Sequence, residues 1–466
     1  MREGIKRRTF LKSALVVAGA TLSRMPGAYA AEPSTGDWRV GEGVVNSTPP
    51  LGIELGGFHR APGNERRIEG IRQATAVRAL AMRHGDTSAL VLSIDIAGTS
   101  GDVADRIRKR VGEAVSIPAD HVRVCSTHTH SMPAFCYLRQ WGAIPTDYLA
   151  SVEGYAVEAA KLARADLAPA KLRIGKSRAI GASFNRTTNA YRTDDQFTAD
   201  ATDADRWLDT TLHLLHFERT GGKPSLLWYH FSAHPVCYAD GLAGPDWPGL
   251  VHDRVRASHG IAPVYLQGHA GDVNPGAGDP WRGDAEKTAE AVHASIGRAM
   301  NGLRDVHVPE LRIRSEPYGV DLDLERFQTW LRRYRDTPDQ CAGGEWVDAG
   351  FAKDWYEGNS KQAREERVLS ARISAFQVGE VGIVFHPSEL YSYYGLAIRR
   401  ASPMADTIVV GYTDGLIGYL TDPTAYSAGE YAALTVPKIL DFPPFAPHAA
   451  SRLADAVVDL MRRAAT

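Results

Sequence analysis

The sequence has few of the features that mark several large classes of protein. Only four of its 466 residues are cysteine, which is too few for a disulfide-based scaffold. Lysine and arginine number 53 against 55 aspartate and glutamate, and the first thirty residues hold six of the basic residues but only one acidic residue. The rest of the chain is therefore mildly acidic and lacks the clustered positive charge that nucleic acid requires. We expect no nucleic-acid partner.

Long apolar segments and several common catalytic motifs are also missing. No run after residue 30 approaches the roughly 20 apolar residues of a membrane-spanning helix. No GxSxG elbow, Walker loop, HExxH helix or Rossmann GxGxxG stands in a suitable context. The hydrophobic content of 44% is high enough to build a large core and excludes disorder for the bulk of the chain.

The first thirty residues have the layout of an export signal. Arg7-Arg8 precedes Phe-Leu-Lys, an apolar run extends over residues 13–22, and Ala28-Tyr29-Ala30 is a small-x-small cleavage site. This order resembles a twin-arginine signal, whose machinery exports folded proteins. About ten apolar residues are too short to span a bilayer, which argues against a membrane anchor. We expect a signal peptide over residues 1–30 and a periplasmic or secreted protein.

After the signal, apolar β-rich runs alternate with amphipathic helical patterns, which is typical of an α/β fold. We predict mixed β-sheets flanked by helices, in a single domain over residues 31–466. A polar, charge-rich helical stretch over residues 322–367 is interpreted as an insertion or lid. The predicted hairpins pair 74–82 with 89–96, 212–217 with 225–231, and 373–378 with 381–385. Further predicted strands are 122–127 and 263–267, and predicted helices are 102–115, 147–164, 285–300 and 450–463.

The strongest local signal is Thr127-His128-Thr129-His130-Ser131, directly after a predicted strand. In an extended segment side chains alternate, so His128 and His130 would point to the same side. Two imidazoles there can both approach a metal, or one can bind it while the other contacts substrate; two hydrogen-bonded loop histidines are the structural alternative. Cys125 and Cys136 flank the motif and could form a disulfide in an oxidising compartment or remain free buried thiols.

Other polar residues also follow predicted strands. His234 comes after the run that contains His230, and Asp272 and Asn274 lie in the segment Gly271-Asp272-Val273-Asn274-Pro275. Glu389 follows the last predicted hairpin, and a Gly-rich segment over residues 409–419 ends in a tyrosine. Each signal alone also fits an ordinary turn or a structural side chain. Their shared position at strand ends is how α/β enzymes build sites, and imidazole with carboxylate around an open position is typical of zinc hydrolases.

Taken together, these segments resemble the catalytic domain of the neutral/alkaline non-lysosomal ceramidase family, from about Val44 to Tyr431. The motifs that carry the resemblance are Asn46-Ser47-Thr48-Pro49-Pro50, Gly56-Gly57-Phe58, Thr127-His128-Thr129-His130-Ser131, Asn185-Arg186, Ala233-His234-Pro235, Asp246-Trp247-Pro248-Gly249, Gly271-Asp272-Val273-Asn274-Pro275, Glu389 and Gly418-Tyr419.

The resemblance implies a site and an activity. One Zn²⁺ per chain would be held by four ligands, and four further residues would act on the substrate. The implied ligands are His128, His234, Glu389 and Tyr419. The implied catalytic residues are His130, Arg186, Asn274 and Tyr426. The expected partner is a small-molecule or lipid-like N-acyl substrate, and the oligomeric state stays open.

Three departures from the family pattern affect the expected substrate. Asn274 replaces a family serine, Met132 enlarges a side chain near the metal, and the chain ends at Thr466 without a C-terminal immunoglobulin-like domain. We therefore weigh three functions. The first is a zinc hydrolase of an N-acyl amide such as a ceramide. The second is a metal-dependent esterase or deacylase for a polar or glycan substrate, and the third is a binding homologue that has lost turnover.

Overall fold

The larger of two main sheets has nine strands. The computed structural model describes residues 38–187, 207–362 and 364–465, and all of them belong to one compact unit. The two outermost strands at each edge of this sheet run parallel to each other, and all the other neighbouring strands are antiparallel. In order across the sheet the strands are β11 (Pro263–Gln267), β9 (Leu226–Phe231), β8 (Thr211–Arg219), β6 (Ala168–Arg178), β1 (Trp38–Asn46), β3 (Ala76–His84), β4 (Thr87–Ile94) and β5 (Val122–Ser126), with β13 (Arg304–Val306) on β6.

The smaller main sheet has four strands, and three two-stranded ladders lie outside both sheets. Its last two strands run parallel and the others antiparallel. The four strands are β14 (Leu311–Asp321), β15 (Val368–Val378), β16 (Val381–Phe385) and β18 (Asp406–Val410). The ladders are β2 (Gly70–Ile71) with β10 (Leu242–Ala243), β7 (Ser183–Asn185) with β12 (Val273–Pro275), and β17 (Glu389–Leu390) with β19 (Tyr419–Leu420).

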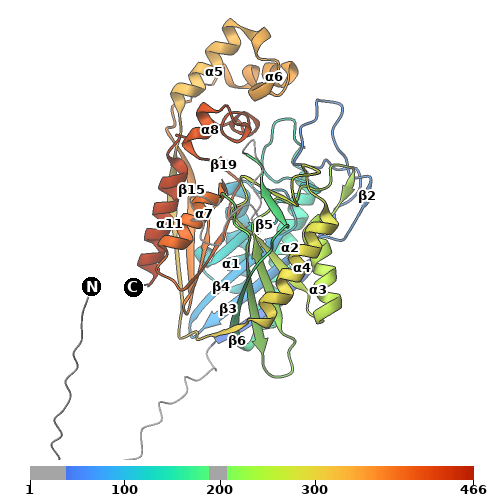
Figure 1. Ribbon diagram of the computed structural model, residues 1–466, viewed down its shortest axis with the longest axis vertical. Helices are drawn as coiled ribbons and strands as arrows, with labels where there is room; N and C mark the ends of the chain where they lie inside the picture. Colours follow the sequence, from blue (N-terminus) through green and yellow to red (C-terminus); the bar gives the residue numbers. More distant parts are fainter. Residues whose placement is uncertain (1–37, 188–206, 363, 466) are drawn as a thin grey trace, which may run out of the picture. The chain divides into compact units, whose positions relative to one another are not determined.

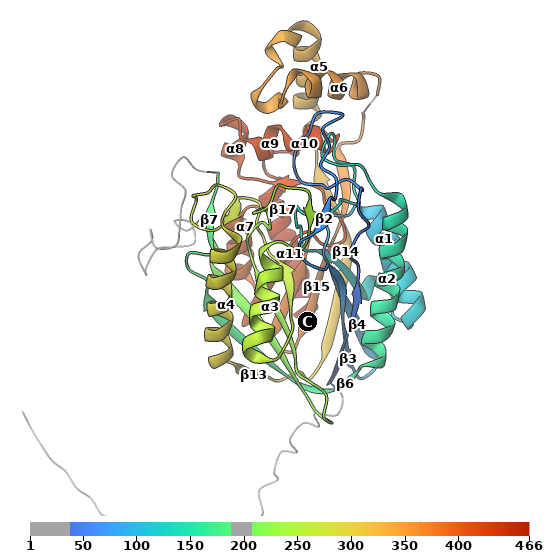
Figure 2. The same cartoon turned by 90° about the vertical axis from the view of Figure 1, so that its right-hand side faces the viewer.

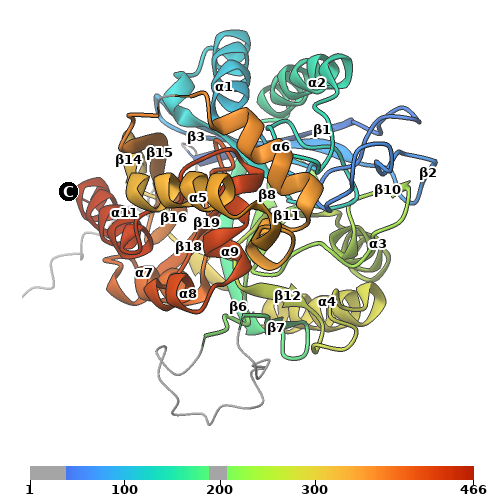
Figure 3. The ribbon, with the colours of Figure 1, turned by 90° about the horizontal axis from the view of Figure 1, so that it is seen from above.

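Helices cover the outer face of each sheet, so the chain forms a helix–sheet–sheet–helix sandwich (Figures 1, 2 and 3). The larger sheet carries α1 (Gly101–Val115), α2 (Thr146–Ala165), α3 (Trp247–His259) and α4 (Ala285–Asn301). The smaller sheet carries α7 (Ser392–Ala401) and α11 (Ala449–Ala465). Short helices complete the chain: η1 (Ala119–His121), α8 (Pro423–Ser427), α9 (Tyr431–Leu434) and α10 (Val436–Ile439).

The two sheets pack face to face through their apolar side chains. Leu80 and Trp228 of the larger sheet belong to the same buried cluster as Phe376 and Ile383 of the smaller sheet. On the opposite face of the larger sheet, two glycines of β1 let α2 approach closely. A Cβ atom on Gly43 would lie 2.0 Å from the Ala159 carbonyl oxygen of α2, so only glycine fits there.

The predicted fold class, with mixed sheets flanked by helices, is confirmed, and so are the three predicted hairpins. The predicted strands and helices are present with ends shifted by at most about two residues at most boundaries. The sequence interpretation left α3 unassigned. This helix begins after Asp246, whose carboxylate accepts a hydrogen bond from the Trp247 amide, and Pro248 occupies its first turn.

The stretch 322–367 lies between β14 and β15, which pair along their whole length. It holds α5 (Leu324–Asp336), η3 (Pro338–Gln340), η4 (Gly344–Trp346) and α6 (Ala349–Asn359), and Figure 1 shows it at the end of the sheets. Buried aromatic residues such as Trp330, Trp346 and Trp355 form its interior. Its suggested role as a lid stays a prediction.

Among the residues that the structure describes, no helix has the length and apolar character needed to cross a membrane. The predicted export signal at residues 1–30 lies outside the described residues.

Candidate metal centre and substrate pocket

Four strands lead into the site and deliver its side chains. His128 and His130 follow β5, His234 follows β9, Glu389 follows β16, and Tyr419 follows the loop after β18. Because β4 and β5, β9 and β11, and β16 and β18 are parallel pairs, the carboxyl ends of each pair meet at one sheet edge. The sequence interpretation relied on this principle, and the structure brings these side chains together.

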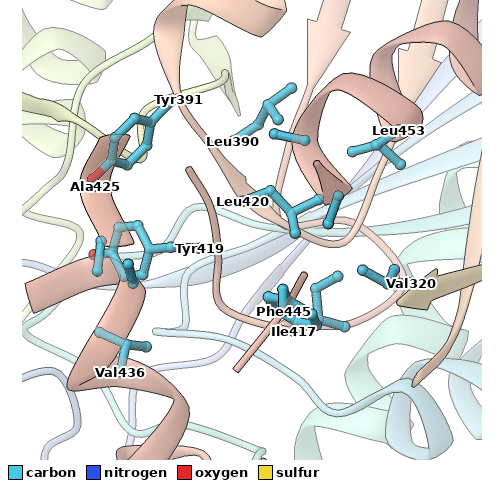
Figure 4. Packing of buried hydrophobic residues seen from close by; sticks show 14 of the residues in the cluster. Val320, Leu390, Tyr391, Ile417, Tyr419, Leu420, Ala425, Val436, Phe445 and Leu453 are labelled. Carbon is cyan, nitrogen blue, oxygen red and sulfur yellow. The ribbon is translucent and has the colours of Figure 1, made fainter. Parts of the chain in front are cut away.

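The ladder β17–β19 sets two of these residues side by side. Glu389 is directly opposite Tyr419 in the parallel register, and Leu390 is opposite Leu420. Figure 4 shows Leu390 and Leu420 in the apolar cluster, and both are completely buried. Their burial fixes the ladder, so the alternate residues Glu389 and Tyr419 are held on the side of the site.

Four side-chain atoms surround one point at the spacing of a tetrahedral metal site. The Glu389 Oε2 atom lies 3.3 Å from His128 Nε2 and 3.1 Å from His234 Nε2, and Tyr419 Oη lies 3.5 Å from His234 Nε2. Ligands about 2.0–2.1 Å from a zinc ion in tetrahedral geometry are about 3.3 Å apart. The donor set and its spacing therefore fit a zinc ion.

The other ring nitrogens of two histidines are fixed by the backbone. His128 Nδ1 lies 2.6 Å from the Ala97 carbonyl oxygen, and His234 Nδ1 lies 2.9 Å from the Val273 carbonyl oxygen. A carbonyl can only accept, so each Nδ1 carries the proton and each Nε2 keeps its lone pair. This is the arrangement that orients metal-binding histidines in proteins.

His128 reaches the site through an unusual backbone conformation. The sequence argument assumed an extended segment, but β5 ends at Ser126 and His128 has a φ of 63°, so strand alternation does not apply. The two rings nevertheless converge, with the centroids of His128 and His130 4.9 Å apart. Tyr412 stacks on His128 at 4.3 Å between centroids. Positive φ is costly for a residue other than glycine, and such strain is common at functional sites.

His130 is the least constrained of the three histidines. Its Nε2 lies 3.3 Å from His128 Nε2, while its buried Nδ1 has no hydrogen-bond partner among the described residues. Burial, together with the neighbouring His128 and His234, lowers the pKa of His130 well below its usual 6.5. A Cβ atom on Gly57 would lie 2.6 Å from the His130 ring, which explains the glycine beside Phe58.

Two donor sets can thus be drawn. The three histidines have ring nitrogens within 4.8 Å of one another and could hold a metal as a triad. The set with Glu389 and Tyr419 is the better fit, because it supplies the four donors of a tetrahedral site and uses the two histidines whose Nδ1 atoms bond to the backbone. Burial alone would raise the pKa of Glu389, but His128 and His234 outweigh burial and hold that pKa well below its ordinary value.

Arg186 places a positive charge beside the candidate metal centre. Its guanidinium donates to Tyr419 Oη at 2.7 Å, to the Gly271 carbonyl oxygen at 3.0 Å and to Asn274 Oδ1 at 2.9 Å. The ladder β7–β12 places Arg186 and Asn274 near each other. Arginine is always charged, so the positive charge of Arg186 is permanent.

Asn274 supports this arginine and does not itself face the substrate pocket. It is completely buried, its Oδ1 accepts from Arg186, and its Nδ2 donates to the Trp281 carbonyl oxygen at 2.7 Å. Asn274 does not line the pocket. The prediction that it acts directly in catalysis is therefore corrected to a positioning role, because both ends of its amide are used within the protein.

A pocket of about 420 Å³ opens beside the centre, with mainly aromatic walls. Such a pocket, mostly apolar with a few polar groups, is typical of a small-molecule site. Its lining residues include His130, Arg186, Gly57, Phe58, Trp141, Trp281, Tyr391, Tyr419, Glu430 and Tyr431.

Tyr426, a predicted catalytic residue, is not among the lining residues. It is buried on α8, where the Arg326 guanidinium lies 5.3 Å from its ring centroid. Tyr431, which begins α9 and is 45% exposed, lines the pocket instead. The catalytic role predicted for Tyr426 stays a prediction, and its helix α8 is separate from the helix α9 that carries the pocket-lining Tyr431.

Sequence reasoning did not assign a role to the aromatic walls. Trp281 and Tyr431 are both about half exposed, and each stands in a polar, Gly- or Pro-containing segment. A large aromatic side chain in such a segment is a sequence signal that could have indicated a pocket-lining role.

Cys125 and Cys136 are free and buried in this structure, so the disulfide alternative does not hold there. Burial raises the pKa of each thiol to about 12.

Comparisons with known proteins agree with the expected resemblance. Residues 38–241 match the family model of the neutral/alkaline non-lysosomal ceramidase N-terminal region. A neutral ceramidase of Mycobacterium tuberculosis is 22% identical over 449 residues, covering 79% of this chain and 69% of that protein. The predicted resemblance to this family is confirmed.

Solved structures confirm the fold. The crystal structure of neutral ceramidase from Pseudomonas aeruginosa matches with a TM-score of 0.69 and 18% identity, covering 91% of this chain and 74% of that chain. A ceramidase complexed with C2 matches with a TM-score of 0.67 and 17% identity, covering 91% and 75%. At this level of identity the likeness establishes the fold and leaves the activity to be argued from the site.

Proposed function

We propose that this chain is a zinc-dependent hydrolase that cleaves an N-acyl amide bond. The observation that carries the proposal is the spacing of His128 Nε2, His234 Nε2, Glu389 Oε2 and Tyr419 Oη, which fits one tetrahedral zinc ion. When bound, zinc supplies a Lewis acid and lowers the pKa of a coordinated water to about 7. The likeness to neutral ceramidases supports this assignment.

The chain's own residues supply charge and proton transfer. Arg186 lines the pocket next to Tyr419, so its positive charge can stabilise the oxyanion that forms on the substrate carbonyl. One well-placed donor of this kind is worth about 2.7–4 kcal/mol. His130 also lines the pocket, is neutral at pH 7 and has an unoccupied Nδ1, so it can accept a proton and return it to the leaving amine.

The pocket favours an apolar chain next to the scissile bond. Phe58, Trp141, Trp281 and Tyr431 are among its lining residues, and their rings suit an acyl or alkyl chain. A lipid-like N-acyl substrate therefore fits better than the polar or glycan substrate of the esterase alternative. The position of Asn274 behind Arg186 removes the main reason to suspect a binding protein without turnover.

Metal analysis combined with turnover tests this proposal. The purified protein should contain about one zinc per chain and hydrolyse a fluorogenic N-acyl amide, and a chelator should abolish both until zinc is restored. The matched fluorogenic ester should be no better a substrate than the amide. Protein that hydrolyses the amide without stoichiometric metal, or is insensitive to the chelator, would contradict the proposal.

We also propose that residues 1–30 direct export through the twin-arginine machinery and that residues 31–466 act as one catalytic domain. The paired arginines and the short apolar run support this. Replacing Arg7-Arg8 with two lysines should retain the protein in the cytoplasm, and fractionation of cells that express either form measures this. Unchanged export would contradict the assignment.

A further inference from the structure

The carboxylate of Glu430 is the charged group of the pocket whose bonds to the described residues leave one atom unused. Arg186 is accounted for by its bonds to Tyr419, Gly271 and Asn274. Glu430 lines the same pocket, is partly buried, and forms no ion pair with any residue that the structure describes. Isolated carboxylates are costly to keep in partly apolar surroundings, so this one needs an explanation.

The local structure does not use the Glu430 carboxylate to stabilise a helix. Glu430 precedes α9 at its N-cap position, but its side chain makes no capping hydrogen bond. Its Oε2 accepts from the Tyr391 hydroxyl at 2.8 Å, and no hydrogen bond to Oε1 is formed by the described residues. Tyr391 is almost completely buried just after the β17 strand, so it fixes the carboxylate from behind and leaves one oxygen for the pocket.

Aromatic rings line the same pocket as Glu430. Tyr431 lies 6.3 Å from Trp141 and 6.4 Å from Tyr419 between ring centroids, and all three rings line the pocket with Glu430. Aromatic faces attract cations and tolerate the apolar part of a ligand. A carboxylate set among such rings is suited to a group that donates a hydrogen bond and is carried on an otherwise apolar chain.

We propose that Glu430, oriented by Tyr391, forms a subsite for a hydrogen-bond donor, a hydroxyl or a protonated amine, on a substrate whose chain fills the aromatic pocket. The inference rests on the proposed amide hydrolysis and deepens it by naming the substrate class: N-acyl compounds with a polar donor near the scissile bond. Plain alkyl amides would leave Glu430 unpaired, and desolvation of the carboxylate would weaken their binding.

Binding of analogues that cannot be hydrolysed tests the subsite without relying on turnover. We would use ketones in which a methylene replaces the amide nitrogen, with a terminal methyl, hydroxyl or primary amine on either chain. Calorimetry on the zinc-loaded protein should show that at least one donor-bearing analogue binds about tenfold more tightly than the methyl analogue, as expected for a hydrogen bond to a charged group.

Variants of Glu430 identify the donor. Glu430→Gln keeps an acceptor oxygen but loses the charge, so it should abolish the advantage of the amine analogue and keep most of that of the hydroxyl analogue. Glu430→Ala should abolish both advantages. Glu113→Gln, on the exposed face of α1, is the matched control and should change neither. Circular dichroism and zinc content establish that each variant is folded.

The outcomes separate this inference from the proposed function. Equal affinity of all analogues for the wild-type protein, or a donor advantage that survives Glu430→Ala, would overturn the subsite even if amides are hydrolysed. Absence of hydrolysis together with a donor advantage that depends on Glu430 would overturn the proposed function and keep the subsite.

Discussion

Two groups of buried histidines differ in the atoms that their ring nitrogens face. Burial lowers the pKa of His234 and of His230 to about 3 alike, although only His234 belongs to the candidate metal centre. A low pKa therefore reports burial and does not identify a site. The metal-centre histidines are His128, His130 and His234, and the inner histidines are His213, His230, His269 and His386.

The partners of the ring nitrogens separate the two groups. Three inner histidines have separate partners: His230 Nε2 lies 2.8 Å from the Val409 carbonyl oxygen, His269 Nε2 lies 3.0 Å from Asp209 Oδ2, and His386 Nδ1 lies 3.0 Å from Ser388 Oγ. In the metal centre, His128 and His234 present their Nε2 atoms to a single Glu389 oxygen. A metal ion can stabilise several lone pairs that converge on one point. Ring nitrogens that each bond to a separate partner stabilise only the fold.

Replacing a histidine of the metal centre should have the largest effect on activity. His234→Ala removes one ligand, so we expect zinc content to fall to near zero and amide hydrolysis to fall about 10³-fold or more. The apparent melting temperature of the metal-free protein should also fall, because the completely buried ring leaves a cavity and its bond to Val273 is lost. Atomic absorption, turnover and thermal melts measure the three effects.

The companion variant in the inner group should destabilise the fold but keep the zinc content. His269→Ala removes the neighbour of Asp209 and leaves a cavity, so we expect a loss of about 2–3 kcal/mol in the free energy of unfolding. Folded protein should still bind zinc with full stoichiometry. Denaturant titration and metal analysis provide the test, and loss of zinc from folded His269→Ala would erase the distinction between the two groups.

Acid should destabilise the protein through the inner histidines. Burial lowers the pKa of His230 and of His386 to about 3, whereas the unfolded chain takes up these protons near pH 6.5. The unfolded state thus binds more protons, and stability is complete above about pH 6.5 and decreases as the pH falls toward 3. Between pH 7 and pH 5, each of these two histidines should lower the free energy of unfolding by about 2 kcal/mol.

Denaturant titrations at several pH values measure this slope. His230→Gln carries no titrating ring, so its stability should depend less steeply on pH than that of the wild type by about one proton. His252→Gln, a substitution in a partly exposed helical position, is the control and should keep the wild-type slope. An unchanged slope in His230→Gln would assign the acid sensitivity to other groups.

The sequence could identify the strand ends but not every side chain that meets there. Hairpins and helices follow from hydrophobic periodicity, which is local. His128, His234 and Glu389 follow strands that lie in different parts of two sheets, and the packing of those sheets brings them together. The directions of the rings depend on a left-handed residue at position 128 and on carbonyls from distant segments. Neither the strained backbone nor those long-range bonds leave a periodic signal in the sequence.

The tyrosines show the same limit. Tyr419 is fixed by its register opposite Glu389, a pairing that no local pattern specifies, and it came from the family resemblance. Tyr426 and Tyr431 are five residues apart, and two short helices with different packing decide which one reaches the pocket. A short sequence motif cannot assign the role of one tyrosine when the chain turns between two short helices, because a shift of a few residues moves the role to the other helix.

The smallest effect on activity is expected at Asn274, which contacts Arg186 and is not one of the four candidate ligands. Asn274→Ser replaces an amide that bonds to both Arg186 and the Trp281 backbone with a hydroxyl that is too short to hold both. Arg186 keeps its bonds to Tyr419 and Gly271, so we expect kcat to fall about three- to tenfold, equivalent to about 1 kcal/mol for one lost hydrogen bond. Zinc stoichiometry should stay at the wild-type value.

The direction of this change separates positioning from direct catalysis. If Asn274 only orients Arg186, then Asn274→Ala should resemble Asn274→Ser, and Arg186→Lys should make the two Asn274 substitutions nearly neutral, because the bond that they break is already lost. A double-mutant cycle in kcat measures that coupling. Faster turnover in Asn274→Ser than in the wild type would mean that a serine hydroxyl contributes directly to the chemistry, which the buried, fully bonded amide of Asn274 argues against.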